Sequence, residues 1–255
     1  MPSQDTGHTT RAFPGRHRHD SGPPARRRHR QSQTRRSARY QQTRHRRAGP
    51  SIGLGDVDDI APKGTLIGDG AALNLLGDDV IRGRGGNDNL FGGDGKDKLY
   101  GDTGNDILSG GKGSDRLDGG KGKDKLIGSN GLDRLFGGDG KDNLKGGDGL
   151  DKLYGGAGRD LLAGGRNDDI LVGDGGFDRF VFKDNSGRDT VKDFNLSAQE
   201  DIDLKGVTQI TSYADLTANH MTQVGRDILI DDNAGTQIVL EGILLANLGK
   251  GDFLF

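Results

Sequence analysis

The chain has 255 residues, of which 47 are glycine and only 30% are apolar, and it contains neither cysteine nor tryptophan. So few apolar residues cannot fill an ordinary globular core of that length, and the lack of cysteine excludes disulfides and thiolate metal sites. The net charge of −2 hides an asymmetry: residues 1–50 carry 13 Arg and 2 acidic residues, whereas the rest carries 23 basic and 36 acidic residues. Another source of stability is therefore required.

Residues 1–50 are a low-complexity segment of Arg, Gln, Ser, His and Pro. With scarcely any Leu, Ile or Val to bury, this segment cannot offset its ordering entropy, which predicts a disordered Arg-rich arm and linker over residues 1–62. No nucleic-acid partner is expected, because the isolated aromatics Phe13 and Tyr40 offer no stacking platform. No apolar run reaches the roughly 18 residues of a membrane span, and the amino-terminal residues lack the apolar stretch of a Sec signal.

A nine-residue period dominates the chain from Gly83 to Val181, where eleven nonapeptides follow one another without a gap. Position one is always Gly, position four is Gly except at Asn167, and position eight is Leu except at Phe180. Position six is always Asp, namely Asp88, Asp97, Asp106, Asp115, Asp124, Asp133, Asp142, Asp151, Asp160, Asp169 and Asp178. A pattern kept over eleven copies predicts a repeat architecture.

Each repeat is expected to be a glycine turn followed by a short strand whose Leu points inward. Two repeats then make one coil of a flattened solenoid, and alternate repeats stack about 4.8 Å apart in two parallel sheets. Gly77, Asp78 and Asp79 fit positions four to six of a weaker copy ending at Arg82, and the roll is predicted over residues 63–181. Burial of one Leu per repeat falls short of the ordering entropy of a Gly-rich coil, so the roll alone is expected to be marginal.

Stacking also brings the Asp residues of every second repeat close together, where carboxylates repel. Basic residues at positions five and seven, such as Lys96 and Lys98, moderate the net repulsion. Ca²⁺ takes six to eight oxygen ligands in flexible geometry and suits Gly-rich turns that expose carbonyl groups beside Asp, whereas Mg²⁺ demands a tighter octahedron. The gaps between stacked repeats predict about nine ions. The sequence contains neither the G-x-x-x-x-G-K-[ST] nucleotide loop nor an EF-hand.

Residues 83–181 resemble the RTX (repeats-in-toxin) family of hemolysin-type calcium-binding nonapeptides, G-G-x-G-x-D-x-U-x. The resemblance implies an all-β fold, a right-handed parallel β-roll, in which calcium lies between successive turns. It also implies that the eleven position-six Asp residues bind the metal together with backbone oxygens. Proteins with such repeats are usually secreted by bacteria, so the resemblance implies an extracellular location.

After Val181 the period fails and strand signals appear at residues 180–182, 190–194 and 202–204, with a helix start near Ser212 and a hairpin from Ile228 to Leu240. Residues 182–255 are predicted to form a β-rich cap over the last Leu layer. The run FDRFVFKDNSGRDTVKDFN followed by DIDL resembles the segment that closes the β-roll of serralysin-like proteases. The terminal DFLF is similar to the uncleaved signal of type I secretion substrates, which implies the type I machinery as a partner.

Four acidic residues near this junction, Asp178, Asp184, Asp189 and Asp193, are candidates for a further ion site. No catalytic constellation is predicted, because H-E-x-x-H and Cys are absent and His220, expected on the surface, is the one His after residue 50.

The sequence thus predicts a secreted, non-enzymatic calcium-binding protein. One alternative is an extracellular surface or polysaccharide-binding module, similar to the RTX modules of alginate epimerases, in which Lys98, Lys125 and Lys152 face an acidic glycan. The other alternative is the detached C-terminal part of a serralysin-like protease or another RTX enzyme.

Overall fold

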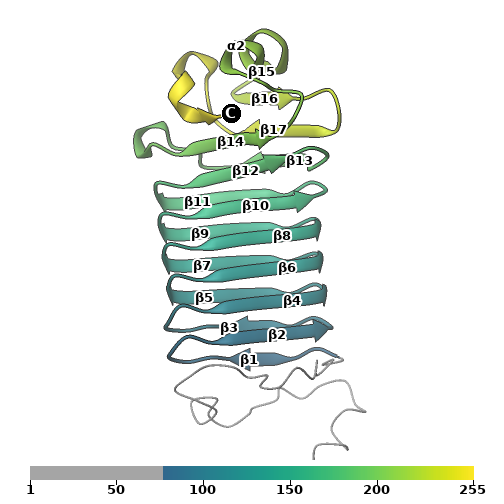
Figure 1. Cartoon of the computed structure of the whole chain (residues 1–255), viewed down its shortest axis with the longest axis vertical. Helices are drawn as coiled ribbons and strands as arrows, with labels where there is room; N and C mark the ends of the chain where they lie inside the picture. The colour runs from purple at the N-terminus through teal and green to yellow at the C-terminus, as the bar shows by residue number, and fades with distance from the viewer. Residues whose placement is uncertain (1–76) are drawn as a thin grey trace, which may run out of the picture. The chain divides into compact units, whose positions relative to one another are not determined.

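The computed structural model describes residues 77–255. The predicted arm and linker, residues 1–62, and residues 63–76 of the predicted roll lie outside the described residues. The described part is a β-solenoid whose coils stack one above the next from β1 to the cap, as Figure 1 shows. The predicted fold class, an all-β parallel roll built from nonapeptides, is confirmed.

Two sheets make up the described structure, and alternate strands of the roll belong to alternate sheets. In sheet order, the ten-stranded sheet contains β1 (Val80–Arg82), β3 (Lys98–Tyr100), β5 (Arg116–Gly122), β7 (Arg134–Gly140), β9 (Lys152–Gly158), β11 (Ile170–Gly176), β13 (Gly187–Val191), β17 (Thr236–Leu240), β16 (Asp227–Asp231) and β15 (Met221–Val224). The eight-stranded sheet contains β18 (Phe253–Leu254), β14 (Asp201–Gly206), β12 (Arg179–Lys183), β10 (Leu161–Arg166), β8 (Asn143–Gly149), β6 (Lys125–Gly131), β4 (Ile107–Gly113) and β2 (Asn89–Asp94).

The nine-residue period sets the register of both sheets. Strands pair in parallel with their neighbours 18 residues away, so that Leu117 lies opposite Leu135 and Leu135 opposite Leu153. These position-eight leucines are fully buried between the sheets, and the residues on either side of them point outward, as alternation along a strand requires. The predicted coil of two nonapeptides around a Leu core is confirmed.

Glycine is required where neighbouring coils approach most closely. Gly122, at position four, has φ of +135°, and an added Cβ would overlap the carbonyl oxygen of Gly104 in the preceding coil. An ordinary side chain there would be strained and would also push the coils apart.

We expect Gly122→Ala to destabilise the calcium-loaded protein by about 3 kcal/mol or more, because backbone strain and steric overlap add. Gly175→Ala is a matched control in β11, since an added Cβ there would meet only Gly156 O, at 3.8 Å. Thermal or denaturant unfolding followed by circular dichroism measures the difference. Equal losses in both variants would contradict the steric argument.

The cap continues both sheets and closes the core. The Leu column is followed by larger buried side chains, including Phe180, Phe182 and Ile202, and the ring of Phe194 meets that of Phe180 edge-on at 6.1 Å. The predicted hairpin is confirmed as β16 and β17, which pair antiparallel.

Helical segments of the cap are short. The predicted helix start is confirmed, because the Ser212 side chain caps α2 (Tyr213–Asp215) by accepting from the N–H of Asp215. The remaining helical turns are a π-helical turn (Leu216–His220) and three 3₁₀ turns (Leu196–Ala198, Leu245–Asn247 and Lys250–Asp252). Strands β15 and β18 were not predicted from the sequence.

Candidate metal centre

Two columns of acidic side chains, buried except for the half-buried Asp88, run along the roll, one at each corner where the chain passes between the sheets. The first ladder consists of Asp79, Asp97, Asp115, Asp133, Asp151, Asp169 and Asp189. The second ladder consists of Asp88, Asp106, Asp124, Asp142, Asp160 and Asp178. The structure therefore brings all eleven predicted residues together, in two separate sets, because alternate repeats turn at opposite corners.

Each ladder is held together by one repeated hydrogen bond. The backbone N–H of each member donates to Oδ1 of the next member, over 2.7 to 2.9 Å. This bond crosses from one coil to the next, so Asp fixes the spacing of the coils as well as offering charge. Asn would keep this acceptor but would lose the charge.

In most ladder members the second carboxylate oxygen, Oδ2, is buried and has no hydrogen-bond partner. This holds for the ten predicted residues from Asp97 to Asp178. A Cβ added to Gly119 would stand 2.6 Å from Oδ2 of Asp124 and 2.6 Å from the carbonyl oxygen of Gly137, so both oxygens point into a space that only glycine leaves open. Buried unpaired carboxylate oxygens are costly unless a proton or a cation satisfies them.

The donor set of this space suits a hard cation. Each gap between stacked coils offers carboxylate oxygens and main-chain carbonyl oxygens, which are the ligands of Ca²⁺. No three His, Cys, Asp or Glu side chains converge on one point within residues 77–255. Carbonyl oxygens of the glycine turns must therefore complete any coordination sphere. The residues present fit Ca²⁺, the ion predicted from the sequence.

The unpaired carboxylates resist ionisation in the absence of a metal. Burial and, to a smaller extent, the neighbouring ladder carboxylates raise the pKa of Asp106 and of Asp142 to about 7, although the donated backbone N–H opposes the change. The pKa of Asp169 rises to about 8, for the same reasons, with Asp189 and Asp151 as the nearby charges. Ionisation of these buried carboxyl groups therefore destabilises the metal-free roll.

Without calcium, the roll should fold better in acid. A carboxyl group whose pKa is raised by folding binds protons in the folded state that it releases in the unfolded state, so its stability contribution is present at low pH and is lost as the pH rises through the folded pKa. The ordinary pKa of 3.8 and the folded values of about 6 for Asp97 and about 8 for Asp169 place the loss between about pH 4 and 8. Circular dichroism in buffer stripped of calcium should show more β-structure at about pH 5.5 than at pH 8. A signal that instead declines in acid would contradict this prediction.

Three ladder positions lie outside the eleven regular repeats. Asp79 occupies position six of the predicted weaker copy, and its N–H donates to Oδ1 of Asp97 at 2.8 Å. Asp189 follows Asp169 after 20 residues, and Glu200 stands beside Asp178 after 22 residues, because Arg179 pairs with Asp201. A strict nine-residue period does not identify Asp189 and Glu200 as ladder positions.

The missed residues share a signal with the repeats. Asp189 precedes Thr190 and the buried Val191, and Glu200 precedes Asp201 and the buried Ile202, which repeats the acid-x-apolar pattern of positions six to eight. The Oδ2 atom of Asp189 and Oε1 of Glu200 are buried and unpaired, like the ladder oxygens. Burial raises the pKa of each group to about 7.

The four acidic residues predicted near the junction do not gather into one site. Asp178 and Asp189 belong to different ladders. Asp184 accepts two bonds from Thr208, at 2.7 and 2.8 Å. The carboxylate of Asp193 accepts the N–H groups of residues 173 and 174, at 2.9 and 2.7 Å.

The basic side chains at positions five and seven point outward, away from the ladder carboxylates, because alternate residues face opposite sides of a strand. The three lysines predicted to face one glycan are also separated by the fold. Lys98 and Lys152 lie on the ten-stranded sheet, whereas Lys125 lies on the eight-stranded sheet.

His220, the one histidine within residues 77–255, lies 3.7 Å from a carboxylate oxygen of Asp215 through Nε2. His220 is only 10% exposed at its side chain and donates from Nδ1 to the carbonyl oxygen of Asp231 at 2.8 Å, so the predicted surface position is wrong. Folding of the π-helical turn against the hairpin explains its burial. No helix within residues 77–255 is long and apolar enough to cross a membrane.

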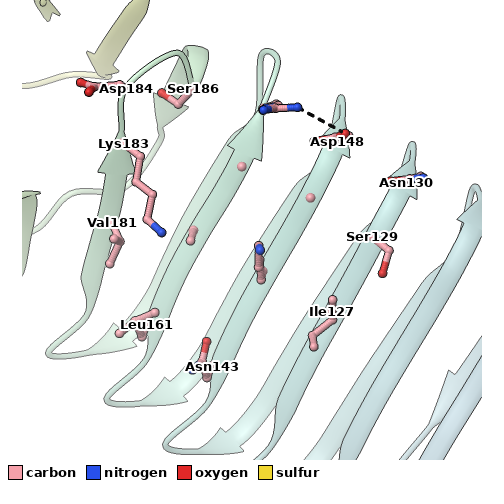
Figure 2. Close-up of a pocket in the computed structure, with 15 residues that line it drawn as sticks. Ile127, Ser129, Asn130, Asn143, Asp148, Leu161, Val181, Lys183, Asp184 and Ser186 are labelled. Carbon is pink, nitrogen blue, oxygen red and sulfur yellow. Dashed lines mark ion pairs between the residues drawn. The ribbon is translucent and has the colours of Figure 1, made fainter. Parts of the chain in front are cut away.

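A hollow of about 750 Å³ lies on the outer face of the eight-stranded sheet. Figure 2 shows Ile127 on β6, Leu161 on β10 and Val181 on β12 among the residues that line it. Asp148 forms an ion pair with Arg166 at 3.9 Å across its rim. No histidine is present among the described residues that line the hollow.

Comparison with known proteins agrees with the ladder geometry. The model of the RTX calcium-binding nonapeptide repeat matches residues 75–108, 100–135, 109–144, 122–152 and 145–180. Repeats of this family bind several Ca²⁺ ions per array and are typically non-catalytic. No curated protein matches the chain.

Among solved structures, the extracellular lipase LipA from Serratia marcescens is similar to this chain, with 21% identity and a TM-score of 0.36. The similarity covers 70% of this chain and 40% of the lipase, so the chain spans less than half of the lipase. The nonapeptide array, with its two ladders and glycine turns, belongs to the RTX calcium-binding repeats.

Proposed function

We propose that this chain is a secreted calcium-binding protein whose roll folds when calcium enters the gaps between its Gly-Asp turns. The observation that carries the proposal is the set of buried carboxylate oxygens without partners, repeated in every coil and facing glycine carbonyls. Inside a cell with little free calcium the chain would remain largely unfolded, and it would fold outside, where calcium is abundant. RTX repeat proteins are typically secreted, which is consistent with the proposal.

Within each gap, Oδ2 of the position-six Asp and the carbonyl oxygen of a position-one Gly would hold the ion. A bound calcium would supply positive charge that offsets the carboxylate repulsion. The Oδ1 atoms would continue to accept backbone N–H groups and so keep the coils in register. Export through the type I machinery is the route we propose, on the resemblance of the C-terminal residues to its substrates.

The number of ions provides the direct test. The first ladder has seven acidic positions, and the second has seven when Glu200 is included, so each ladder has six gaps and about twelve ions are expected instead of the nine predicted from the regular repeats. Isothermal titration calorimetry together with circular dichroism should show uptake of many ions coupled to a gain of β-structure. A chain that takes up one ion or none would contradict the proposal.

A further inference from the structure

A row of three cations lies at the corner where the chain passes from the ten-stranded to the eight-stranded sheet. Lys123, Lys141 and Arg159 occupy position five of alternate repeats, and all three are exposed. Because neighbouring coils are about 4.8 Å apart, the row extends over about 10 Å. We call these three residues the basic corner.

No acidic side chain neutralises the basic corner. Several other exposed cations of the roll have partners, such as Arg82 with Asp102 at 3.1 Å and Lys112 with Asp94 at 3.3 Å. No ion pair involves the basic corner anywhere in the described part of the chain, and the adjoining ladder carboxylates point inward. Like charges on adjacent coils repel, so an anion bound here would relieve an existing cost.

The basic corner borders a hollow of about 380 Å³, which is also lined by Asn143, Phe177 and Gln199. Within the described residues, the side-chain amides of Asn143 and Gln199 make no hydrogen bond, and both residues are exposed. Phe177 is 49% exposed, and the guanidinium of Arg159 lies 5.9 Å from its ring centre. The hollow is also lined by Arg179 and Asp201, which pair with each other at 3.1 Å, and by the buried ladder residues Asp142 and Asp160. Its unpaired exposed charges are therefore the three cations of the basic corner, beside neutral amides and one aromatic ring.

We propose that the basic corner binds an acidic oligosaccharide. Carboxylate or sulfate groups along the ligand would pair with the three cations, and its hydroxyl groups would bond to Asn143 and Gln199, whose amides both donate and accept. A sugar ring would pack beside Phe177. A single-stranded nucleic acid is disfavoured, because one aromatic side chain provides no succession of stacking platforms.

This inference rests on the proposed calcium-loaded fold, because residues 18 apart become neighbours only in the roll. It also places the glycan contact at different residues from those predicted from the sequence. The three lysines of that prediction lie on two different sheets, whereas the basic corner is one continuous row beside a hollow.

The test measures binding of a fluorescent chondroitin sulfate hexasaccharide to the full chain in saturating calcium, by fluorescence anisotropy. The triple variant Lys123→Gln, Lys141→Gln, Arg159→Gln should weaken binding at least about tenfold. The matched triple Lys98→Gln, Arg134→Gln, Lys152→Gln removes the same three charges from the ten-stranded sheet and should weaken it less than about threefold. The single variant Lys141→Gln, which perturbs the chain least, should also weaken binding, but by less than the basic-corner triple.

Equal weakening by the two triples would overturn the proposal, since only overall charge would then matter. A folded wild-type chain that fails to bind the hexasaccharide, or that binds oligothymidylate as tightly, would also overturn it. Circular dichroism of each sample in calcium separates this failure from the other proposal: a wild-type chain without β-structure contradicts the proposed function, whereas a folded chain without glycan affinity contradicts only the basic corner.

Discussion

Removal of calcium is expected to abolish most of the β-sheet signal of the purified chain at about pH 7.5. At that pH most ladder carboxylates would have to be ionised and buried together, without a partner for Oδ2. In the proposed function calcium binds the folded roll far better than the unfolded chain, so its removal would withdraw the binding free energy from folding. Far-UV circular dichroism and the hydrodynamic radius, measured with and without chelator, report the change.

Magnesium at the same concentration is the control, because its small octahedral shell suits the turn carbonyls poorly. We expect magnesium to restore little of the β-signal, whereas added calcium should restore all of it. A chain that keeps its full β-signal in chelator at this pH would show that the leucine column and the coil-to-coil hydrogen bonds are sufficient alone.

Replacement of three central members of the first ladder should uncouple folding from calcium. In the variant Asp115→Asn, Asp133→Asn, Asp151→Asn, each amide oxygen can still accept the backbone N–H from the neighbouring coil. The amide NH₂ takes the place of Oδ2 and can donate to the facing glycine carbonyl. This contact between neutral groups requires no cation. Four gaps would lose a ligand, so we expect about four fewer ions and a lower calcium requirement for folding.

Calorimetric stoichiometry and the calcium midpoint of the β-signal measure these two effects. The control variant Asp94→Asn, Asp139→Asn, Asp148→Asn removes the same charge from positions outside the ladders and should leave the number of ions unchanged. Replacement of the three ladder residues by Ala should instead destabilise the roll in calcium, because the coil-to-coil hydrogen bonds are lost as well. Unchanged ion uptake in the Asn variant would exclude the first ladder as the site.

The sequence was sufficient to predict the coil, its core and the ladder residues of the regular array. Each requirement there is local and repeated: Gly122 must be small where coils meet, Leu135 must point inward, and Asp133 must follow the turn. When the same steric demand recurs every nine residues, the register of one coil determines that of the next. The positions of eleven acidic side chains therefore follow from the nine-residue period alone.

The ends of the ladders were decided by tertiary structure. Asp189 and Glu200 join the ladders because their strands pair with the last coils, even though two and four extra residues have broken the spacing. A loop can absorb such insertions without disturbing the strand that follows, so sequence distance no longer reports spatial distance. Burial of His220 depends in the same way on a hairpin that lies later in the chain.

The distribution of exposed cations also needed the folded chain. The sequence shows Lys and Arg at positions five and seven, but it does not show that Lys123, Lys141 and Arg159 form one row beside a hollow while Lys98 and Lys125 occupy different sheets. Composition and period determine what each coil contains, because those are properties of neighbouring residues. The surfaces on which side chains meet are set by the pairing of strands 18 or more residues apart, and that pairing exists only in the tertiary structure.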